Sequence, residues 1–238
     1  MKKELTQKGT TPEELHYNYY SAEKYEDDIR RAIPGYGEMH TGIKKALATE
    51  FGAKKITVLE LGIGTGLTAQ VVLDNVNVGK YLGIDFSQSM LNGARKRLER
   101  YPVELELGDY AAVDFPKENG LVISVISIHH QATPRDKKKL FKKIYKCLSA
   151  DGIFLFGDLF TQRNEHEAAL NEAYHFHHLV ENAVDEKTLA EWAHHYKFVN
   201  HLAAIEDQIK WLKQAGFTDV EVLYSKFNTA AIIAKKGG

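Results

Sequence analysis

The stretch Lys55–Gln70, KITVLELGIGTGLTAQ, contains the transition on which the fold depends. It begins with an apolar, β-branched run typical of a buried strand and ends with the apolar spacing of a helix. Between the two, Gly62, Gly64 and Gly66 leave the backbone bare at alternate positions, and Glu60 stands two residues ahead of the first glycine. The stretch therefore predicts a strand, a loop whose backbone can approach a ligand closely, and a helix.

Strand-like and helix-like stretches continue to alternate after this loop. The run 120–128 is almost entirely apolar, as expected for a central parallel strand covered on both faces. Ser87 is the expected N-cap of one helix, and Gly216 the expected end of another. The alternation predicts an α/β fold with a doubly wound, mostly parallel, seven-stranded sheet. The expected strands are 55–61, 80–86, 103–109, 120–128 and 152–160, followed by a closing antiparallel hairpin of 219–227 and 229–236.

Composition divides the chain into four parts. Residues 1–52 are expected to form an N-terminal helical segment or lid, and residues 53–161 the cofactor-binding α/β core. Residues 162–204 are polar and rich in His, Tyr and Trp, which predicts a helical lid inserted into the fold. Residues 205–238 supply the last helix and the strand hairpin that complete the core.

The overall composition limits the classes of partner. The 238 residues include 31 Lys and Arg against 32 Asp and Glu, whereas a nucleic-acid-binding protein usually has a basic excess, so nucleic acid is disfavoured. The single cysteine, Cys147, excludes an internal disulfide and a multi-cysteine metal site. No apolar run has the length of a membrane span, and residues 1–15 lack the apolar core of a signal peptide. We expect a cytoplasmic protein with no membrane partner, and a homodimer is compatible with the sequence.

Acidic residues at the strand ends indicate which ligand the glycine loop holds. The pattern is GxGxG, and a leucine occupies the position at which a dinucleotide fingerprint requires a third glycine. The Glu60 carboxylate would repel a pyrophosphate but attract an ammonium or sulfonium group. Asp85 ends the second expected strand, where a carboxylate can accept both hydroxyls of a ribose. Asp109 ends the third, where it could accept a hydrogen bond from an adenine amino group.

Six segments, in family order, resemble a class I S-adenosylmethionine-dependent methyltransferase. They are LELGIGTG (59–66), GIDFSQSML (83–91), LELGDY (105–110), LVISVISIHH (121–130), LFKKIYKCLSADGIFLFGD (140–158) and WLKQAGFTDVEVLYSKFNTAAIIAKK (211–236). The resemblance extends from about residue 56 to the C-terminus. It implies a Rossmann-like sheet, S-adenosyl-L-methionine as the cofactor and S-adenosyl-L-homocysteine as the product.

The resemblance also implies a place for each cofactor-binding residue. Glu60 and the loop Gly62–Gly66 would face the methionine part, and Asp85 the ribose. Asp109 and Tyr110 would face the adenine. Ser127 and Ile128 would lie beneath the sulfonium. Independently of the resemblance, Phe86 and Met90, which follow the second expected strand, could sandwich the adenine.

Two histidines, His129 and His130, follow the fourth expected strand and are candidates for catalysis. Methyl transfer to a nucleophile that carries a proton needs a base, and an imidazole titrates near neutrality. We expect His130 to be the base and to contact the substrate, with His129 as the second candidate. The alternative is that one or both only pack or form hydrogen bonds at the strand end.

The segment ahead of the core carries tyrosines and arginines that suit an anionic group. In the resembling proteins such a segment folds over the cofactor and the substrate. Tyr19 or Tyr25 could bond the methionine carboxylate, and Arg30 or Arg31 could pair with it or with an acidic substrate. Tyr36 is a further candidate for contact with the substrate. The alternative for each tyrosine is packing of a helix against the sheet.

Seven of the eleven histidines fall between His166 and His201. His175 and His178 would share a helix face, where they could line an acceptor pocket or bind a divalent metal. Metal-dependent catechol-type methyltransferases use an aspartate after the fourth strand and an Asp-Asn pair after the fifth, whereas this chain offers only Asp158 near these places. We therefore expect no metal, and we expect Asp158, His175 and His178 to help bind the acceptor.

Three functions remain open on the sequence alone. The first is methyl transfer to a small molecule enclosed by the N-terminal segment and the 162–201 insertion. No Asn/Asp-Pro-Pro-Tyr/Phe motif, typical of amino methylation of bases or of glutamine, follows the fourth strand.

The second function is carboxylation of the cofactor with prephenate as donor. DDIRRAIPGYGEMH (27–40) and FNTAAIIAKK (227–236) resemble the carboxy-S-adenosylmethionine synthases of tRNA wobble-uridine modification. Those enzymes rely on a lid arginine, and the matching EWAHHYKFVNHL (191–202) has Lys197 but no arginine. The third function is a non-catalytic, cofactor-binding partner subunit, in which loss of the glycines or acids would be expected.

Overall fold

The computed structural model describes residues 22–237, which form an α/β fold around a seven-stranded sheet. The strand order is β3-β2-β1-β4-β5-β7-β6, with β7 antiparallel to both of its neighbours and the other pairs parallel. This confirms the predicted mostly parallel sheet that ends in an antiparallel hairpin. The strands are β1 (Ile56–Leu61), β2 (Val78–Asp85), β3 (Val103–Leu107), β4 (Asn119–Val125), β5 (Leu148–Leu159), β6 (Asp219–Lys226) and β7 (Thr229–Lys235).

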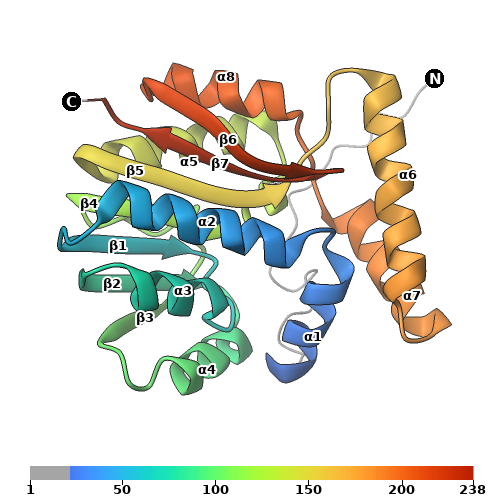
Figure 1. Ribbon diagram of the computed structural model, residues 1–238, viewed down its shortest axis with the longest axis horizontal. Coiled ribbons are helices and arrows are strands. Elements are labelled where there is room, and N and C mark those ends of the chain that lie inside the picture. Colours follow the sequence, from blue (N-terminus) through green and yellow to red (C-terminus); the bar gives the residue numbers. More distant parts are fainter. Residues whose placement is uncertain (1–21, 238) are drawn as a thin grey trace.

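Helices cover both faces of the sheet (Figure 1). Because successive side chains of a strand point to opposite faces, Val58 of β1 packs with one helical layer and Leu59 with the other. Both residues are fully buried, which explains why the central strands are nearly continuous apolar runs. The first layer contains α2 (Tyr36–Phe51), α3 (Leu67–Asn75) and α4 (Gln88–Arg97), and the second contains α5 (Pro134–Cys147) and α8 (Ile205–Ala215).

The predicted helix ends follow from local side-chain and backbone chemistry. The Ser87 hydroxyl accepts a hydrogen bond from the Met90 amide at 3.3 Å and so caps α4. Gly216 follows α8 with φ of 121°, a conformation that side chains rarely adopt. The predicted N-cap and the predicted helix end are both confirmed.

Three further helices lie together at one end of the sheet, beside the carboxyl ends of the parallel strands (Figure 1). They are α1 (Ala22–Ala32), α6 (Glu165–Asn182) and α7 (Glu186–His194), and α7 continues into a π-helical turn at His195–Val199. α6 contacts both α1 and α7. The division of the chain into four parts stays a prediction, although α6 and α7 do fall within the expected 162–204 lid. Within residues 22–237, no helix combines the length and the apolar character that crossing a membrane would need.

Candidate functional site

The glycine loop turns sharply between β1 and α3. The amides of Gly62 and Ile63 both donate to the Ile84 carbonyl, at 2.9 and 3.1 Å, which holds the loop against the end of β2. Gly62 has φ of 70°, and a Cβ there would lie 2.3 Å from Ser127 Oγ. Gly64 has φ of 56°, and a Cβ there would meet its nearest atom, in the Tyr25 ring, only at 4.0 Å. The first glycine is thus required by packing, whereas the second faces open space.

Alanine at Gly62 is expected to destabilise the fold more than alanine at Gly64. Both substitutions cost about 1–2 kcal/mol for a left-handed backbone, but only the first also forces a methyl group into Ser127. Urea unfolding followed by circular dichroism would measure the difference between the two single variants. Equal midpoints for the two variants would contradict the packing argument.

Asp85 anchors the loop from the carboxyl end of β2. Its Oδ2 accepts a hydrogen bond from the Gly64 amide at 2.8 Å, and its Oδ1 accepts one from the Ser87 amide at 2.9 Å. Burial raises the pKa of the Asp85 carboxyl, and these amides act in the opposite direction. The side chain therefore joins β2, the glycine loop and the start of α4.

Glu60 lies inside the protein, where it is 1% exposed. The Tyr81 hydroxyl donates to Glu60 Oε2 at 2.6 Å. Burial raises the pKa of Glu60 to about 8, against the lowering effect of the Tyr81 hydrogen bond. Burial therefore favours the protonated carboxyl near neutral pH, and an approaching cationic group would favour its ionisation.

Arg97 of α4 ties helix α1 to the glycine loop. Its Nε donates to the Thr65 carbonyl at 3.0 Å, its Nη1 donates to Gln70 at 3.0 Å, and its Nη2 forms an ion pair with Glu26 of α1. The Thr65 hydroxyl is buried and makes no hydrogen bond within the described part of the chain. The loop thus presents an unused polar atom to its surroundings.

Among the other residues predicted to hold the cofactor, Ser127 and Tyr110 lie beside Gly62. The Tyr110 hydroxyl donates to the Ser127 carbonyl, and the Ser127 hydroxyl donates to Tyr110, both at 3.1 Å. Asp109 is exposed, and its Oδ1 accepts from the Ala111 amide at 2.7 Å. Three more predicted residues complete the set: Met90 and Ile128, which are buried, and Phe86, which is half-buried.

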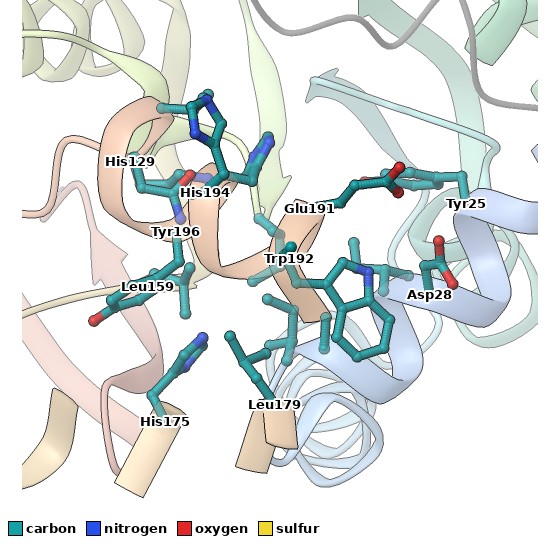
Figure 2. Close-up of a pocket in the computed structure, with 18 of the residues that line it drawn as sticks. Tyr25, Asp28, His129, Leu159, His175, Leu179, Glu191, Trp192, His194 and Tyr196 are labelled. Carbon is teal, nitrogen blue, oxygen red and sulfur yellow. The ribbon is translucent and has the colours of Figure 1, made fainter. Parts of the chain in front are cut away.

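A cavity of about 760 Å³ lies between α1, α6, α7 and the ends of β4 and β5 (Figure 2). This volume falls in the range of small-molecule sites. Tyr25 lines the cavity and also approaches Gly64, so the cavity adjoins the glycine loop. Its walls are largely apolar and aromatic, and include Ile29, Ile33, Ile126, Leu159, Leu179, Trp192, Tyr196 and Val199.

His129 reaches this cavity as part of a buried pair with Asp158. The His129 amide donates to Asp158 Oδ2 at 2.8 Å, and its ring Nδ1 is hydrogen-bonded to Asp158 Oδ1. The pair forms because β4 ends early: Ile126 adopts φ of 51°, and Ile128–His130 form a 3₁₀ turn. When the His129 ring is uncharged, a carboxylate on Nδ1 selects the tautomer that leaves Nε2 as a hydrogen-bond acceptor.

His130, the sequence's first candidate for the base, lies behind His129 rather than on the cavity wall described for residues 22–237. Its ring centroid is 4.0 Å from that of His129 and 5.6 Å from that of His195. Burial lowers the pKa of His130 well below its usual range, and His129 and His195 add to the effect. His130 is therefore uncharged at neutral pH.

His175, on α6, lines another part of the cavity. Its Nδ1 lies 2.9 Å from Asn228 Oδ1, and Asn228 Nδ2 donates to the Tyr196 hydroxyl at 2.8 Å. The His175 ring stacks on Tyr196 with centroids 4.2 Å apart. Because the Asn228 oxygen can only accept, His175 carries its proton on Nδ1 and Nε2 is an acceptor.

Acid is expected to unfold the protein partly through His175. Burial lowers its folded pKa from 6.5 to about 4, so between these pH values the unfolded chain binds a proton that the folded chain does not. Its contribution to stability is thus present above pH 6.5 and is lost as the pH falls toward 4, by up to about 1.4 kcal/mol per pH unit. Urea unfolding would measure the free energy of unfolding between pH 7 and 5. This free energy should fall less steeply with falling pH in His175→Gln than in the native protein.

The matched control is His177→Gln, on the same helix, because the His177 side chain is 69% exposed. It should leave the pH slope unchanged. Comparing slopes rather than single stabilities separates titration from any packing cost of the substitution. A His175→Gln variant with the native slope would contradict the assignment.

Ion pairs flank the cavity. Lys24 of α1 lies 4.0 Å from Glu191 of α7, and Arg31 is 3.0 Å from Asp28. The Arg31 guanidinium also lies 5.7 Å from the centre of the Trp192 ring. Lys24, Asp28 and Glu191 line the cavity, and each has an oppositely charged neighbour.

Several predicted substrate residues lie away from the cavity wall. Arg30 is exposed, and Tyr36 is buried with its ring beside that of His40. His178 is half-buried on α6, where its carbonyl accepts from Asn182 at 2.8 Å. Tyr19 falls outside the described residues. No group of three or more His, Cys, Asp or Glu side chains within residues 22–237 is arranged to hold a metal ion.

The sequence arguments missed three parts of this site. The first is the pairing of His129 with Asp158, although His129 follows β4 and Asp158 lies near the end of the neighbouring strand β5. The second is Lys137, which occupies an apolar position of α5 and donates to the Ile128 carbonyl at 2.9 Å. Burial lowers the pKa of Lys137 to about 8. The third is Trp192, whose place in the wall depends on the lid helices packing together.

Comparison with known proteins gives a consistent family relationship. The family described as "Methyltransferase domain" matches residues 58–152. A carboxy-S-adenosyl-L-methionine synthase of Actinobacillus pleuropneumoniae serotype 5b is 30% identical over 225 residues, which span 90% of this chain and 90% of the relative. One of Mannheimia succiniciproducens is 30% identical over 224 residues, with the same coverage of both chains.

Solved structures with the same fold are more distant in sequence. The CurJ carbon methyltransferase has a TM-score of 0.64 at 15% identity, covering 90% of this chain and 58% of that one. The N-methyltransferase NodS of Bradyrhizobium japonicum has a TM-score of 0.58 at 15% identity, covering 86% of this chain and 98% of that one. These similarities concern the fold.

Proposed function

The chain belongs to the class I S-adenosylmethionine-dependent methyltransferase family, and we propose that it methylates a small-molecule acceptor held in the cavity under α6 and α7. As a member, it is an enzyme that uses S-adenosylmethionine. The observation that carries the proposal is that one cavity reaches both the glycine loop, through Tyr25, and the buried pair His129–Asp158.

The glycine loop fits the cofactor. S-adenosylmethionine supplies a methyl carbon on a positively charged sulfur, which keeps the bonding electrons when the methyl group leaves. Gly64 faces open space, and the buried Thr65 hydroxyl needs a partner. The amides of Gly64, Ser87 and Phe86 do not use all the lone pairs of the Asp85 carboxylate, so we assign Asp85 to the ribose hydroxyls. We assign Glu60 to the ammonium group, whose charge would favour ionisation of this buried carboxyl.

His129 is the proposed base. With Nδ1 bonded to Asp158, its Nε2 can take a proton from an acceptor in the cavity, and the carboxylate stabilises the imidazolium that forms. Asp158 is then a positioning residue rather than a contact with the substrate. The His130 ring packs against the His129 ring, with centroids 4.0 Å apart.

The second candidate function is synthesis of carboxy-S-adenosylmethionine. The names of relatives that match 90% of the chain favour it. An anionic carboxyl donor, however, needs cationic partners in its site. Among the described residues of the cavity wall the cationic side chain is Lys24, which faces Glu191. We therefore place methyl transfer first.

Mass spectrometry separates the two functions. The purified enzyme would be incubated with S-adenosylmethionine and either a library of small molecules or prephenate. Formation of S-adenosylhomocysteine together with a methylated library member would support methyl transfer. A cofactor made heavier by one carboxylate in the presence of prephenate, with no methylated product, would replace the first proposal by the second.

A further inference from the structure

We propose that the acceptor is an uncharged ring compound that donates at least two hydrogen bonds, one from the group that becomes methylated and one from a second hydroxyl or amino group. This inference rests on the proposed function, because it concerns the occupant of the same cavity. It follows from three hydrogen-bond acceptors on residues that line the cavity: His129 Nε2, His175 Nε2 and Asn200 Oδ1.

The two histidine atoms are acceptors because their partners determine the tautomers. His129 gives Nδ1 to Asp158, and His175 gives Nδ1 to Asn228. In each ring the other nitrogen, Nε2, therefore carries a lone pair when the imidazole is uncharged, which is the state that the base needs. Both residues border the cavity (Figure 2), in which Leu159 and Tyr196 are labelled between them in this view.

Asn200 supplies the third acceptor. This residue follows the π-helical turn and lines the cavity. Its Oδ1 is buried and makes no hydrogen bond to any described residue. A buried oxygen without a partner costs about 1–3 kcal/mol, so a ligand that donates to it would recover that free energy.

The charges and the shape of the wall favour an uncharged ring. Each ionic side chain in the described wall, namely Lys24, Asp28 and Glu191, has an oppositely charged neighbour. These pairs leave little net charge to attract an ionic ligand. Burial holds the pKa of His175 at about 4, so this imidazole is neutral and cannot pair with a carboxylate. Trp192 adds an aromatic ring to the cavity wall, and aromatic walls favour ring compounds.

The proposed step balances without a further reactant. The acceptor, X–H, gives its proton to His129 Nε2 as X forms a bond to the methyl carbon. The electrons of the broken sulfur–carbon bond stay on sulfur, which becomes neutral. The products are X–CH₃, S-adenosylhomocysteine and an imidazolium beside Asp158, and nothing is oxidised or reduced.

Binding of matched probes tests the inference without turnover. The probes are catechol, its dimethyl ether and benzoate, which share a ring but differ in hydrogen-bond donors and charge; catechol is uncharged at neutral pH. Calorimetry with the enzyme and S-adenosylhomocysteine should show that the diol binds at least tenfold more tightly than the other two.

Variants identify the atoms that recognise the probe. His175→Phe and Asn200→Ala should each weaken binding of the diol about tenfold, since a good hydrogen bond to a buried acceptor contributes about 1–1.5 kcal/mol. His175→Gln, which keeps an acceptor, should recover part of the loss. His177→Gln is the control, and thermal melting confirms that each variant is folded.

The outcomes distinguish this inference from the proposed function. Tighter binding of the benzoate or the ether than of the diol, or binding of none of the three, would overturn the inference. So would a diol affinity unchanged by His175→Phe and Asn200→Ala. Methyl transfer to some other acceptor would still stand if S-adenosylhomocysteine binds, whereas failure to bind S-adenosylhomocysteine would remove the proposed function itself.

Discussion

Replacing Asp85 with alanine is expected to weaken binding of S-adenosylhomocysteine about 100-fold. The substitution removes the carboxylate that accepts from the amides of Gly64 and Ser87, and with it the proposed ribose contacts. Hydrogen bonds to a charged group contribute about 1.5–3 kcal/mol each, and a loss of about 2.7 kcal/mol corresponds to 100-fold in affinity. Isothermal titration calorimetry with the purified variant would measure the change.

The control for this experiment is Asp74→Asn, which removes an exposed carboxylate that pairs with Arg100. It should bind S-adenosylhomocysteine as the native protein does. Asp85→Asn keeps the size of the side chain and should lie between the native protein and Asp85→Ala, because its amide oxygen can still accept one backbone hydrogen bond. Native affinity in the folded Asp85→Ala variant would refute the placement of the ribose.

Replacing His129 with glutamine is expected to lower the rate of methyl transfer by about 10²–10⁴, the usual contribution of a general base. Binding of S-adenosylhomocysteine should change less than about twofold, which is about 0.4 kcal/mol. The reason is that His129 is assigned to the acceptor and not to the cofactor. Asp158→Asn should also slow transfer, because the imidazole loses the carboxylate that orients it and stabilises its charged form. Single-turnover formation of S-adenosylhomocysteine with the acceptor from the library would give both rates.

A double variant strengthens this test. If His129 and Asp158 act as one unit, the variant that lacks both should be little slower than His129→Gln alone. His177→Gln, which alters an exposed histidine on α6, should retain the native rate. Full activity in folded His129→Gln would leave His129 with a packing role and would return attention to His130.

The fold was largely predictable because its signals are local. The alternating strands and helices, the Ser87 cap and the Gly216 helix end each depend on residues close together in the chain. The central strands β1 and β4 were recognisable because burial on both faces requires a continuous apolar run in each strand. β5 begins at Leu148, four residues earlier than expected, because Leu148 pairs with Asn119 across a shift in register that no local pattern indicates.

The candidate site was predictable only in part. The glycine loop and Asp85 follow strand ends, so their proximity could be inferred from the sheet alone. Which histidine reaches the cavity depends on the backbone after β4, where Ile126 adopts a positive φ that its side chain does not favour. The acceptor atoms of His175 and Asn200 depend on Asn228 and on the packing of α6, which join residues far apart in the sequence.

The burial of His129 and Asp158 sets a condition on each catalytic cycle. Their side chains are 1% and 2% exposed, so the pair has almost no contact with bulk solvent except by way of the cavity. If His129 is the base, the proton that it captures must return to water through the space that the methylated product occupies. Regeneration of the enzyme would then wait for product departure, and a slowly dissociating product would delay deprotonation of His129 as well as rebinding of the acceptor.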